Sequence, residues 1–314
     1  MRLFLCTPHA DRKSESFIDH WRNLHLQDKY GIHEVVTNAE SATHVLVVGS
    51  QLARSDKWFD ALSLFRKFRD TIILVSNERD HPDPFFHGIY TSISKETNCR
   101  RSVPYSYLHN QHISEFVTAE PKYLYSFMGR LTHRVRSDIF SIQDDRSLIL
   151  NTTSVPSFDY SGSINETIKS HQQEMARVLS ASKFVLCPRG VGPSSFRLYE
   201  TLALGAVPVV LSDSWCPPRR VPWDSCCIRV KESEVSSLPD VLRQYESSWE
   251  ELSARVRAVY ADYLSSGSLF NYLAEELNDI DCNKSLQGSR HYLLALGIAY
   301  QLANRYRKSP RLSP

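Results

Sequence analysis

Short apolar runs alternate with helical repeats along the first third of the chain. The runs predict strands at residues 2–7, 32–36, 43–49 and 71–75. Between them, Phe17 and Trp21 lie on one face of a helix that begins at Ser14, and a second amphipathic repeat covers 58–68. Because the strands are continuously apolar and helices separate them, we expect a parallel sheet covered on both faces.

The alternation weakens after residue 95 and starts again after residue 120. The second series predicts strands at 123–128, 147–150, 184–186 and 207–211, and helices from Val135 and over 166–180. Helices dominate after Leu238, and the last one covers 289–307. The sequence therefore predicts an α/β protein with two domains, 1–120 and 121–284, followed by a helical segment, 285–314.

Length and composition agree with this organisation. A chain of 314 residues exceeds the usual size of one hydrophobic core, and 42 % hydrophobic with 23 % charged residues is typical of a globular protein. The net charge of +2 is too small to indicate nucleic-acid binding. No apolar run approaches the ~20 residues of a membrane span, and the apolar stretch at the N-terminus is too short for a signal peptide. We therefore expect a cytoplasmic protein.

Cysteine and histidine spacing gives no sign of a metal site. Seven cysteines form an odd set without a CxxC pair, and the twelve histidines show no convincing metal-ligand spacing. We expect reduced thiols, without disulfides, zinc or a cofactor. Cys187, at the end of a predicted strand, is expected to be a buried thiol and not a nucleophile.

Residues 188–195 (PRGVGPSS) lie where a predicted strand meets a predicted helix. Open α/β sheets bind ligands at the carboxyl ends of their strands, and the N-terminus of a helix favours an anion. Gly190 and Gly192 allow the backbone to approach a ligand closely, and Ser194 or Ser195 can cap the helix. The loop therefore predicts an anion site, although helix capping alone also explains its composition.

Charged residues on either side of the loop extend this interpretation. Arg189 and Arg197 offer planar groups that match phosphate oxygens. Glu200, three residues beyond Arg197, projects from nearly the same helix face and can accept hydrogen bonds from ribose hydroxyls. The alternative is that Arg197 and Glu200 form only a surface ion pair. The loop is neither a Walker loop nor a GxGxxG fingerprint, which disfavours ATPase and NAD-binding functions.

The segment LCPRGVGPSSFRLYETLALGAVPVVLSDSW resembles the nucleotide-sugar-binding segment of the exostosin family of glycosyltransferases. YSFMGRLTHRVR (125–136) is similar to the family's strand, glycine and basic turn, and NERDHPDPFF (77–86) is a weaker match. The resemblance covers 123–230. It implies a GT-B fold, in which two Rossmann-like domains face each other across a cleft. It also implies an inverting transfer from a nucleotide diphosphate sugar, usually UDP-linked, without a metal.

The resemblance assigns roles to the residues of this segment. Arg189 and Arg197 would neutralise the departing diphosphate, which would lie beside Gly190. Ser194 and Ser195 would donate hydrogen bonds to the phosphates. Glu200 would hold the ribose. Three residues of the basic turn, Arg130, His133 and Arg134, would reach the same phosphates, unless they form a solvated turn. Asp213, which follows the strand 207–211, would contact the donor sugar or else cap a helix.

An inverting transfer also needs a base for the acceptor hydroxyl, which we expect in the first, acceptor-side domain. Asp80 and His81, in the loop after strand 71–75, are the first candidates. Glu78 and Asp83 in the same loop are further candidates, as are Asp11 and His9 at the end of the first strand. Each can instead stabilise its loop.

We therefore expect an inverting, metal-independent glycosyltransferase that extends a glycan, such as a surface polysaccharide. Its expected partners are a nucleotide sugar and a glycan or lipid-linked glycan, with no nucleic acid; the oligomeric state is not predicted. Helix 289–307 is expected to pack on the N-terminal domain, or to place its basic end on anionic lipid at the inner membrane. A non-catalytic nucleotide-sugar-binding or scaffold subunit and a phosphorylase remain alternatives.

Overall fold

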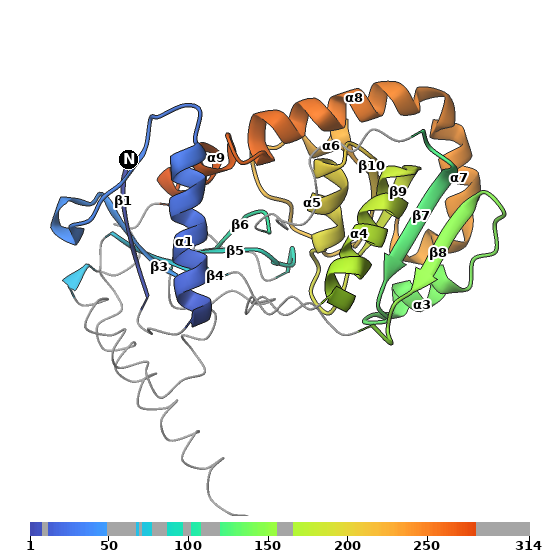
Figure 1. Cartoon of the computed structure of the whole chain (residues 1–314), viewed down its shortest axis with the longest axis horizontal. Helices are drawn as coiled ribbons and strands as arrows, with labels where there is room; N and C mark the ends of the chain where they lie inside the picture. The colour runs from blue at the N-terminus through green and yellow to red at the C-terminus, as the bar shows by residue number, and fades with distance from the viewer. Residues whose placement is uncertain are drawn as a thin grey trace, which may run out of the picture.

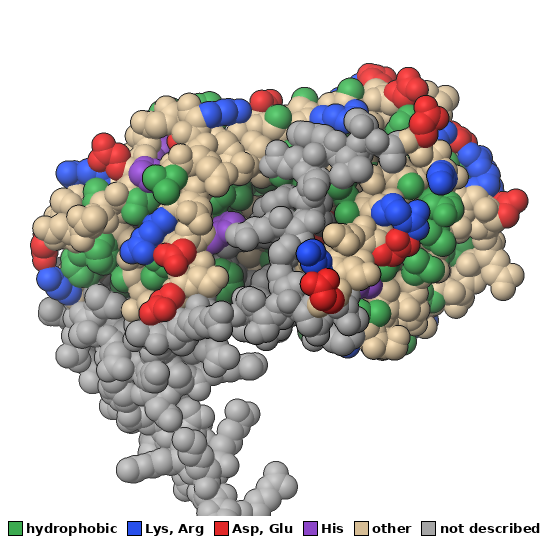
Figure 2. Space-filling view, in the orientation of Figure 1, with side chains coloured by type: hydrophobic (Ala, Val, Ile, Leu, Met, Phe, Trp, Pro, Cys, Tyr) green, Lys and Arg blue, Asp and Glu red, His purple; other side chains and the backbone are tan. Residues whose placement is uncertain are grey.

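The computed structural model describes residues 1–7, 12–48, 67–68, 71–76, 87–96, 102–107, 120–155 and 166–280. Within these ranges, two α/β units stand side by side, each built on a parallel sheet (Figure 1). This is the GT-B-like arrangement of two Rossmann-like units that the sequence predicts. Acidic and basic side chains are interspersed on the face of the second unit shown in Figure 2, which agrees with the small net charge.

The described part of the first unit contains six strands in the order β2-β1-β3-β4-β5-β6, all parallel. Its elements are β1 (Arg2–Cys6), α1 (Arg12–Gln27), β2 (Glu34–Val35), η1 (Ala39–Ser41), β3 (His44–Val48), β4 (Ile72–Ser76), β5 (Gly88–Tyr90) and β6 (Ser102–Pro104). The apolar runs of β3 and β4 are buried, as a sheet covered on both faces requires. Strands β1 to β4 confirm the predicted strands, whereas β5 and β6 were not predicted.

Among the residues described for the second unit, five parallel strands follow the order β11-β10-β9-β7-β8. Its elements are β7 (Tyr123–Gly129), α3 (Arg134–Phe140), β8 (Ser147–Asn151), α4 (Glu166–Ser180), β9 (Ser182–Pro188), α5 (Phe196–Ala203), β10 (Val207–Leu211), α6 (Trp223–Cys226) and β11 (Ile228–Arg229). Strands β7 to β10 and helices α3 to α5 confirm the predictions for this region, whereas α6 and β11 were not predicted. The chain leaves β7 toward β8 on one side and returns to β9 on the other, so the strand order reverses between β7 and β9.

Strands β7 and β9 separate toward their carboxyl ends. Their paired residues end at Ser126 and Val185, although β7 continues to Gly129 and β9 to Pro188. In open α/β sheets, ligands bind in the crevice outside the carboxyl ends of the strands, at the point where the strand order reverses. The topology therefore marks this end of β7 and β9 as the place for a ligand.

Helices follow the second sheet and return to the first unit. They are η2 (Glu232–Ser237), α7 (Leu238–Tyr245), η3 (Glu246–Ser248), α8 (Trp249–Val259), the π-helical turn η4 (Tyr260–Leu264) and α9 (Leu269–Asn278). Helix α9 packs beside α1 (Figure 1), where the rings of His25 and Phe270 lie 4.9 Å apart. His33 Nε2 lies 3.0 Å from Glu275 Oε1. The predicted helix 289–307 and most of helix 58–68 lie outside the described residues.

Helix α9 carries a fully buried carboxylate, Glu276. Arg220 Nε lies 3.6 Å from its Oε1, and neither oxygen accepts a hydrogen bond within the described part of the chain. Burial raises the pKa of Glu276 to about 7. In the unfolded chain the same group titrates near pH 4.3, at about the ordinary value for glutamate. Folding stability should therefore fall as the pH rises from about 4 to about 7.

Glu276→Gln should raise the melting temperature at pH 8 and leave it unchanged at pH 4, because it removes a charge that the folded chain solvates poorly. The expected gain is a few degrees, measured by differential scanning fluorimetry at both pH values. Glu275→Gln is the matched control, since that neighbouring carboxylate is paired with His33 and its loss should bring no gain. The same shift for Glu276→Gln at pH 4 and pH 8 would contradict this assignment.

Candidate functional site

The carboxyl ends of β7, β9 and β10 bring three loops of the second unit together. The loop from β9 to α5 contains the predicted anion-binding residues. Ser195 occupies the N-cap position of α5 with an extended backbone, but its side chain makes no capping hydrogen bond. Ser194 is buried near Tyr199, and its amide donates to Ser92 Oγ of the first unit at 3.2 Å. The helix N-terminus therefore faces the junction between the two units.

Arg189 lies at the start of this loop and reaches the loop after β10. Its Nη1 donates to Ser214 Oγ at 3.1 Å, and its Nη2 donates to the Val191 carbonyl at 3.3 Å. Glu232 Oε1 lies 3.9 Å from Nη1, and the Arg189 side chain is 20 % exposed. The guanidinium is thus held at the rim of the loop and is partly exposed.

Arg197 and Glu200 form an ion pair of 2.6 Å with side chains only 13 % and 11 % exposed. Arg197 Nη2 also donates to the Met128 carbonyl at the end of β7, at 2.7 Å. The pair is therefore interior, not the surface pair considered from the sequence. The Arg197 guanidinium thus bonds both a residue of α5 and the end of β7, and it holds the two together.

The basic turn after β7 is partly committed to local structure. Arg130 Nη1 donates to the Val155 carbonyl at 2.9 Å, and His133 is the N-cap of α3, its Nδ1 accepting from the Val135 amide at 3.3 Å. Partial burial and the nearby charge of Arg189 lower the pKa of His133. Arg134 is exposed at the start of α3. Of the three predicted basic residues, Arg134 is thus the most accessible to solvent.

Asp213 lies in a reciprocal contact with Glu232. Its Oδ1 accepts from the Glu232 amide at 3.2 Å, and its own amide donates to Glu232 Oε1 at 3.1 Å. Glu232 begins η2, so the Asp213 carboxylate caps this short helix, the alternative role considered from the sequence. Lys95 Nζ donates to the Asp213 carbonyl at 2.7 Å, which ties this loop to the first unit.

The first unit reaches the site through the segments that follow β5 and β6. Lys95 N donates to the Ser214 carbonyl at 2.8 Å, and the ring of Tyr107 stacks on Phe196 with 3.7 Å between centroids. The predicted bases Asp80 and His81 lie outside the described residues, as do Glu78, Asp83, Asp11 and His9. The sequence did not identify the segments after β5 and β6, because three-residue strands are too short to show a period.

Two further residues of the site were not predicted. Arg136 of α3 donates to three backbone carbonyls at the ends of β7 and β9. His171 of α4 lies near Arg197 and Glu200, and partial burial together with the Arg197 charge lowers its pKa. The only sequence signal for His171 was its place in the predicted helix 166–180. Arg136 lies in the basic segment 125–136, two residues beyond the predicted Arg134.

The thiols of the described chain are free, and no cluster of metal ligands occurs among the described residues. Cys187 is buried beneath the loop, next to Thr201 Oγ1 at 3.6 Å. Burial raises its pKa to about 12, so it is protonated at neutral pH. Cys187 therefore supports packing, as the sequence predicts. No helix in the described part of the chain has the length and apolar character needed to cross a membrane.

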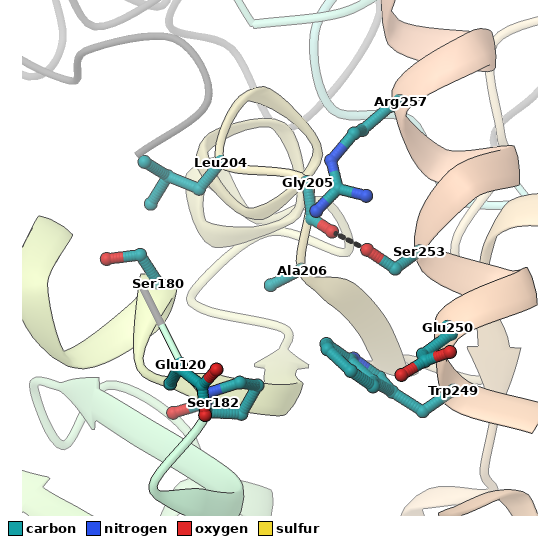
Figure 3. Close-up of a pocket in the computed structure, with 11 residues that line it drawn as sticks. Glu120, Ser180, Ser182, Leu204, Gly205, Ala206, Trp249, Glu250, Ser253 and Arg257 are labelled. Atoms are coloured by element: carbon teal, nitrogen blue, oxygen red, sulfur yellow. Dashed lines mark hydrogen bonds between the residues drawn. The ribbon is translucent and has the colours of Figure 1, made fainter. Parts of the chain in front are cut away.

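A cavity of about 420 Å³ lies at the other end of the second sheet (Figure 3). It is bounded by Trp249, Glu250 and Arg257 of α8 and by the turn at Gly205 before β10, and Ser253 Oγ donates to the Gly205 carbonyl at 2.7 Å. These residues stand at the amino ends of the strands. The cavity is therefore separate from the site at the carboxyl ends.

Gly190→Ala should separate ligand approach from folding. A methyl group at Gly190 would lie 3.5 Å from Arg136 Nη2 and Thr132 Oγ1, an ordinary contact distance, so the fold should accept it. If the backbone approaches a phosphate here, the methyl group should weaken UDP binding by about tenfold, or ~1.4 kcal/mol. Calorimetric titration with UDP and a melting curve measure the two effects.

Gly129→Ala is the contrasting variant. A methyl group there would lie 2.7 Å from the Phe127 ring, so it should destabilise the fold by about 1–3 kcal/mol. An unchanged UDP affinity for a well-folded Gly190→Ala variant would show that the backbone at Gly190 does not approach a phosphate closely.

The profile of the Exostosin GT47 domain matches residues 44–245, more than half of the chain. The chain belongs to the exostosin GT47 family. The match includes the loop from β9 to α5 and the basic turn after β7, so it covers the whole site in the second unit.

Named members of the exostosin family and related enzymes are similar to this chain. The Exostosin-1 homolog of Caenorhabditis elegans is 29 % identical over 196 residues, 58 % of this chain and 48 % of that protein. Exostosin-1 of Drosophila melanogaster is 30 % identical over 137 residues, 40 % and 18 % of the two chains. The probable glucuronoxylan glucuronosyltransferase IRX7 of Arabidopsis thaliana is 43 % identical over 74 residues, 23 % and 16 %. The chain thus spans about half or less of these relatives.

Solved structures of glycosyltransferases are more distant. Anabaena HepE, in complex with UDP and glucose, aligns with 88 % of this chain and 99 % of its own, with a TM-score of 0.47 and 10 % identity. A DNA-modifying β-glucosyltransferase aligns with 88 % and 100 %, with a TM-score of 0.45 and 12 % identity.

Proposed function

We propose that this exostosin GT47 chain transfers a sugar from a nucleotide diphosphate, UDP in the first instance, to a hydroxyl group of a glycan. The observation that carries the proposal is the position of Arg189 and the start of α5, at the point where the strand order of the second sheet reverses. A guanidinium beside a helix N-terminus favours the negative charge of a diphosphate. Family membership supports the same reaction class.

In the proposed reaction, the acceptor oxygen attacks the anomeric carbon as the bond from that carbon to the diphosphate oxygen breaks. Attack from the face opposite the leaving group inverts the configuration. The negative charge on the departing UDP grows in the transition state, so Arg189 assists the reaction by stabilising that charge. The accepting hydroxyl loses its proton to a base of the first unit, for which Asp80 and His81 remain the candidates.

Glu200 is proposed to hold the ribose. Arg197 fixes one oxygen of its carboxylate at 2.6 Å and lies almost entirely inside the protein. A carboxylate whose direction is fixed in this way is a good acceptor for two neighbouring hydroxyl groups. His171 lies near Arg197 and Glu200 and is proposed to contact the nucleoside part of the donor.

Activity should persist in EDTA, because arginines and a helix terminus take the role that a divalent cation has in metal-dependent transferases. The expected result is an unchanged initial rate of UDP release after chelation and desalting. Added Mn²⁺ or Mg²⁺ should then bring no increase. A rate that is lost in EDTA and restored by Mn²⁺ would overturn the metal-independent mechanism.

A ligand panel tests the proposed function. Melting curves with UDP, GDP, CMP and their common sugar conjugates should show stabilisation by uridine diphosphates, since a ligand stabilises the state that it binds. UDP-glucuronic acid belongs in the panel because the Arabidopsis relative is named a probable glucuronosyltransferase. Slow release of UDP from one conjugate would support an enzyme, and binding without any release would support a non-catalytic subunit. No stabilisation by any nucleotide would refute the proposal.

A further inference from the structure

The ends of β7 and β9 still pair with β8 and β10, but the backbone carbonyl groups on their facing sides have no partner strand. The ladder between the strands stops three residues before each of them ends. Buried carbonyl groups need hydrogen-bond donors, whether from the backbone or from side chains. Guanidinium groups supply donors here: Arg197 bonds the Met128 carbonyl of β7, and Arg136 bonds the Pro188 carbonyl of β9 and the carbonyls of Arg130 and Arg189, just past the strand ends.

Arg136 makes three hydrogen bonds with one planar group. Its Nε donates to the Arg189 carbonyl at 2.8 Å, its Nη2 to the Pro188 carbonyl at 3.1 Å and its Nη1 to the Arg130 carbonyl at 3.0 Å. The guanidinium carbon lies 5.6 Å from the centre of the Phe127 ring, beneath the same strand end. One side chain thus joins the loop after β7 to the loop after β9.

These bonds set the direction of the amides that follow. A trans peptide unit is planar, with its C=O and N–H pointing in opposite directions. The Arg189 carbonyl points to Arg136, so the N–H of Gly190 points to the opposite side. The Pro188 carbonyl is held in the same way, and the N–H of Arg189 donates to the Leu211 carbonyl of β10 at 3.0 Å.

We infer that Arg136 is a positioning residue for the donor site: it fixes residues 188–190 so that the Gly190 amide and the Arg189 guanidinium stay directed at the diphosphate. This inference rests on the proposed function. Arg136 acts through its carbonyl partners, because three of its N–H groups are committed to them. Burial and the charge of Arg197 lower its pKa to about 10, so it stays protonated at neutral pH.

Arg136→Lys distinguishes geometry from charge. Lysine keeps the positive charge but has no planar group that can serve three carbonyls in fixed directions. Arg136→Met removes the charge as well and keeps much of the side-chain volume. Arg177→Lys is the matched control, because Arg177 is an exposed arginine of α4 that pairs with Glu174, one turn away.

The first measurement is amide hydrogen exchange of the full chain without ligand, followed by mass spectrometry. Peptides that cover 129–132 and 188–195 should exchange at least tenfold faster in both Arg136 variants, and at the wild-type rate in Arg177→Lys. The second measurement is calorimetric titration with UDP. The affinity should fall about tenfold in Arg136→Lys and further in Arg136→Met, while Arg177→Lys binds as the wild type does.

Wild-type exchange in 188–195, or a wild-type UDP affinity in Arg136→Lys, would overturn the positioning role. If the wild-type chain itself does not bind UDP, the proposed function fails, and the exchange measurement alone decides whether Arg136 fixes the loop. If Arg136→Met does not fold, both measurements are made on Arg136→Lys.

If the chain turns over its donor, the donor KM should rise in Arg136→Lys while the acceptor KM stays constant. General destabilisation does not separate the two constants in this way.

Discussion

Arg189→Ala is expected to lower kcat by about 10²–10³-fold, the range for losing one preorganised electrostatic donor. Its guanidinium contacts Ser214 and the Val191 carbonyl at the rim of the loop, so its charge is available where the leaving diphosphate is proposed to lie. The melting temperature should change by no more than about 2 °C, because a side chain at a loop rim supports little packing. Steady-state rates at saturating donor and a melting curve provide both numbers.

Arg189→Lys is the control that keeps the positive charge but removes the planar guanidinium group. It should recover only part of the lost rate, since a point charge does not reproduce two parallel hydrogen bonds to phosphate oxygens. Normal turnover in a folded Arg189→Ala variant would show that Arg189 does not assist the reaction. A large fall in its melting temperature would show that Arg189 supports the fold.

Glu200→Ala is expected to destabilise the protein by about 3 kcal/mol, in addition to weakening UDP binding. It leaves the Arg197 guanidinium, only 13 % exposed, without its charged partner, and breaking a buried pair from one side is costly. The loss of the ribose contact should weaken UDP binding by a further ~1.5–3 kcal/mol. Urea unfolding measures the first effect, and titration with UDP under native conditions measures the second.

The pair of Glu174 and Arg177 on α4 is the matched control for stability. It has the same spacing of three residues, but its side chains are 44 % and 58 % exposed. Glu174→Ala should therefore cost no more than about 0.5 kcal/mol and leave UDP binding unchanged. Equal costs for Glu174→Ala and Glu200→Ala would contradict the interior role of the Arg197–Glu200 pair.

Arg197→Met with Glu200→Gln completes a double-mutant cycle. The double variant should lose less stability than the sum of the two single variants, Arg197→Met and Glu200→Gln, because no unpaired charge remains inside the protein. UDP affinity should nevertheless stay low in the double variant, since the ribose acceptor is still missing. Recovered affinity would remove Glu200 from the ribose site.

The sequence predicted most of the second unit because its elements are long and strongly patterned. Helix α4 spans Glu166–Ser180 as predicted, and the run VPVVL forms β10. The loop between β9 and α5 lies where a strand meets a helix, as its Gly, Pro and Ser residues indicated. Local patterns sufficed here, because burial on both faces of a parallel strand leaves a continuous apolar run.

Other features of the site depend on contacts between distant parts of the chain. Strands β5 and β6 have three residues each, too few to show any period, yet the segments after them contact the second unit. The sequence of the basic segment contains several arginines. The separation of β7 from β9, which the sequence does not show, explains why Arg136 bonds backbone carbonyls at the ends of these strands. The interior position of Arg197 and Glu200 likewise depends on α4 and β7, which pack around them.

A nucleoside diphosphate is proposed to bind at the carboxyl ends of β7 and β9. Hydrogen exchange of the wild-type chain, with and without saturating UDP, tests it most directly. The account predicts slower exchange in peptides that cover 130–136 and 188–200, with no change around Gly205 and α8, where the cavity of Figure 3 lies. Protection of the cavity residues, with 188–200 unchanged, would contradict the account.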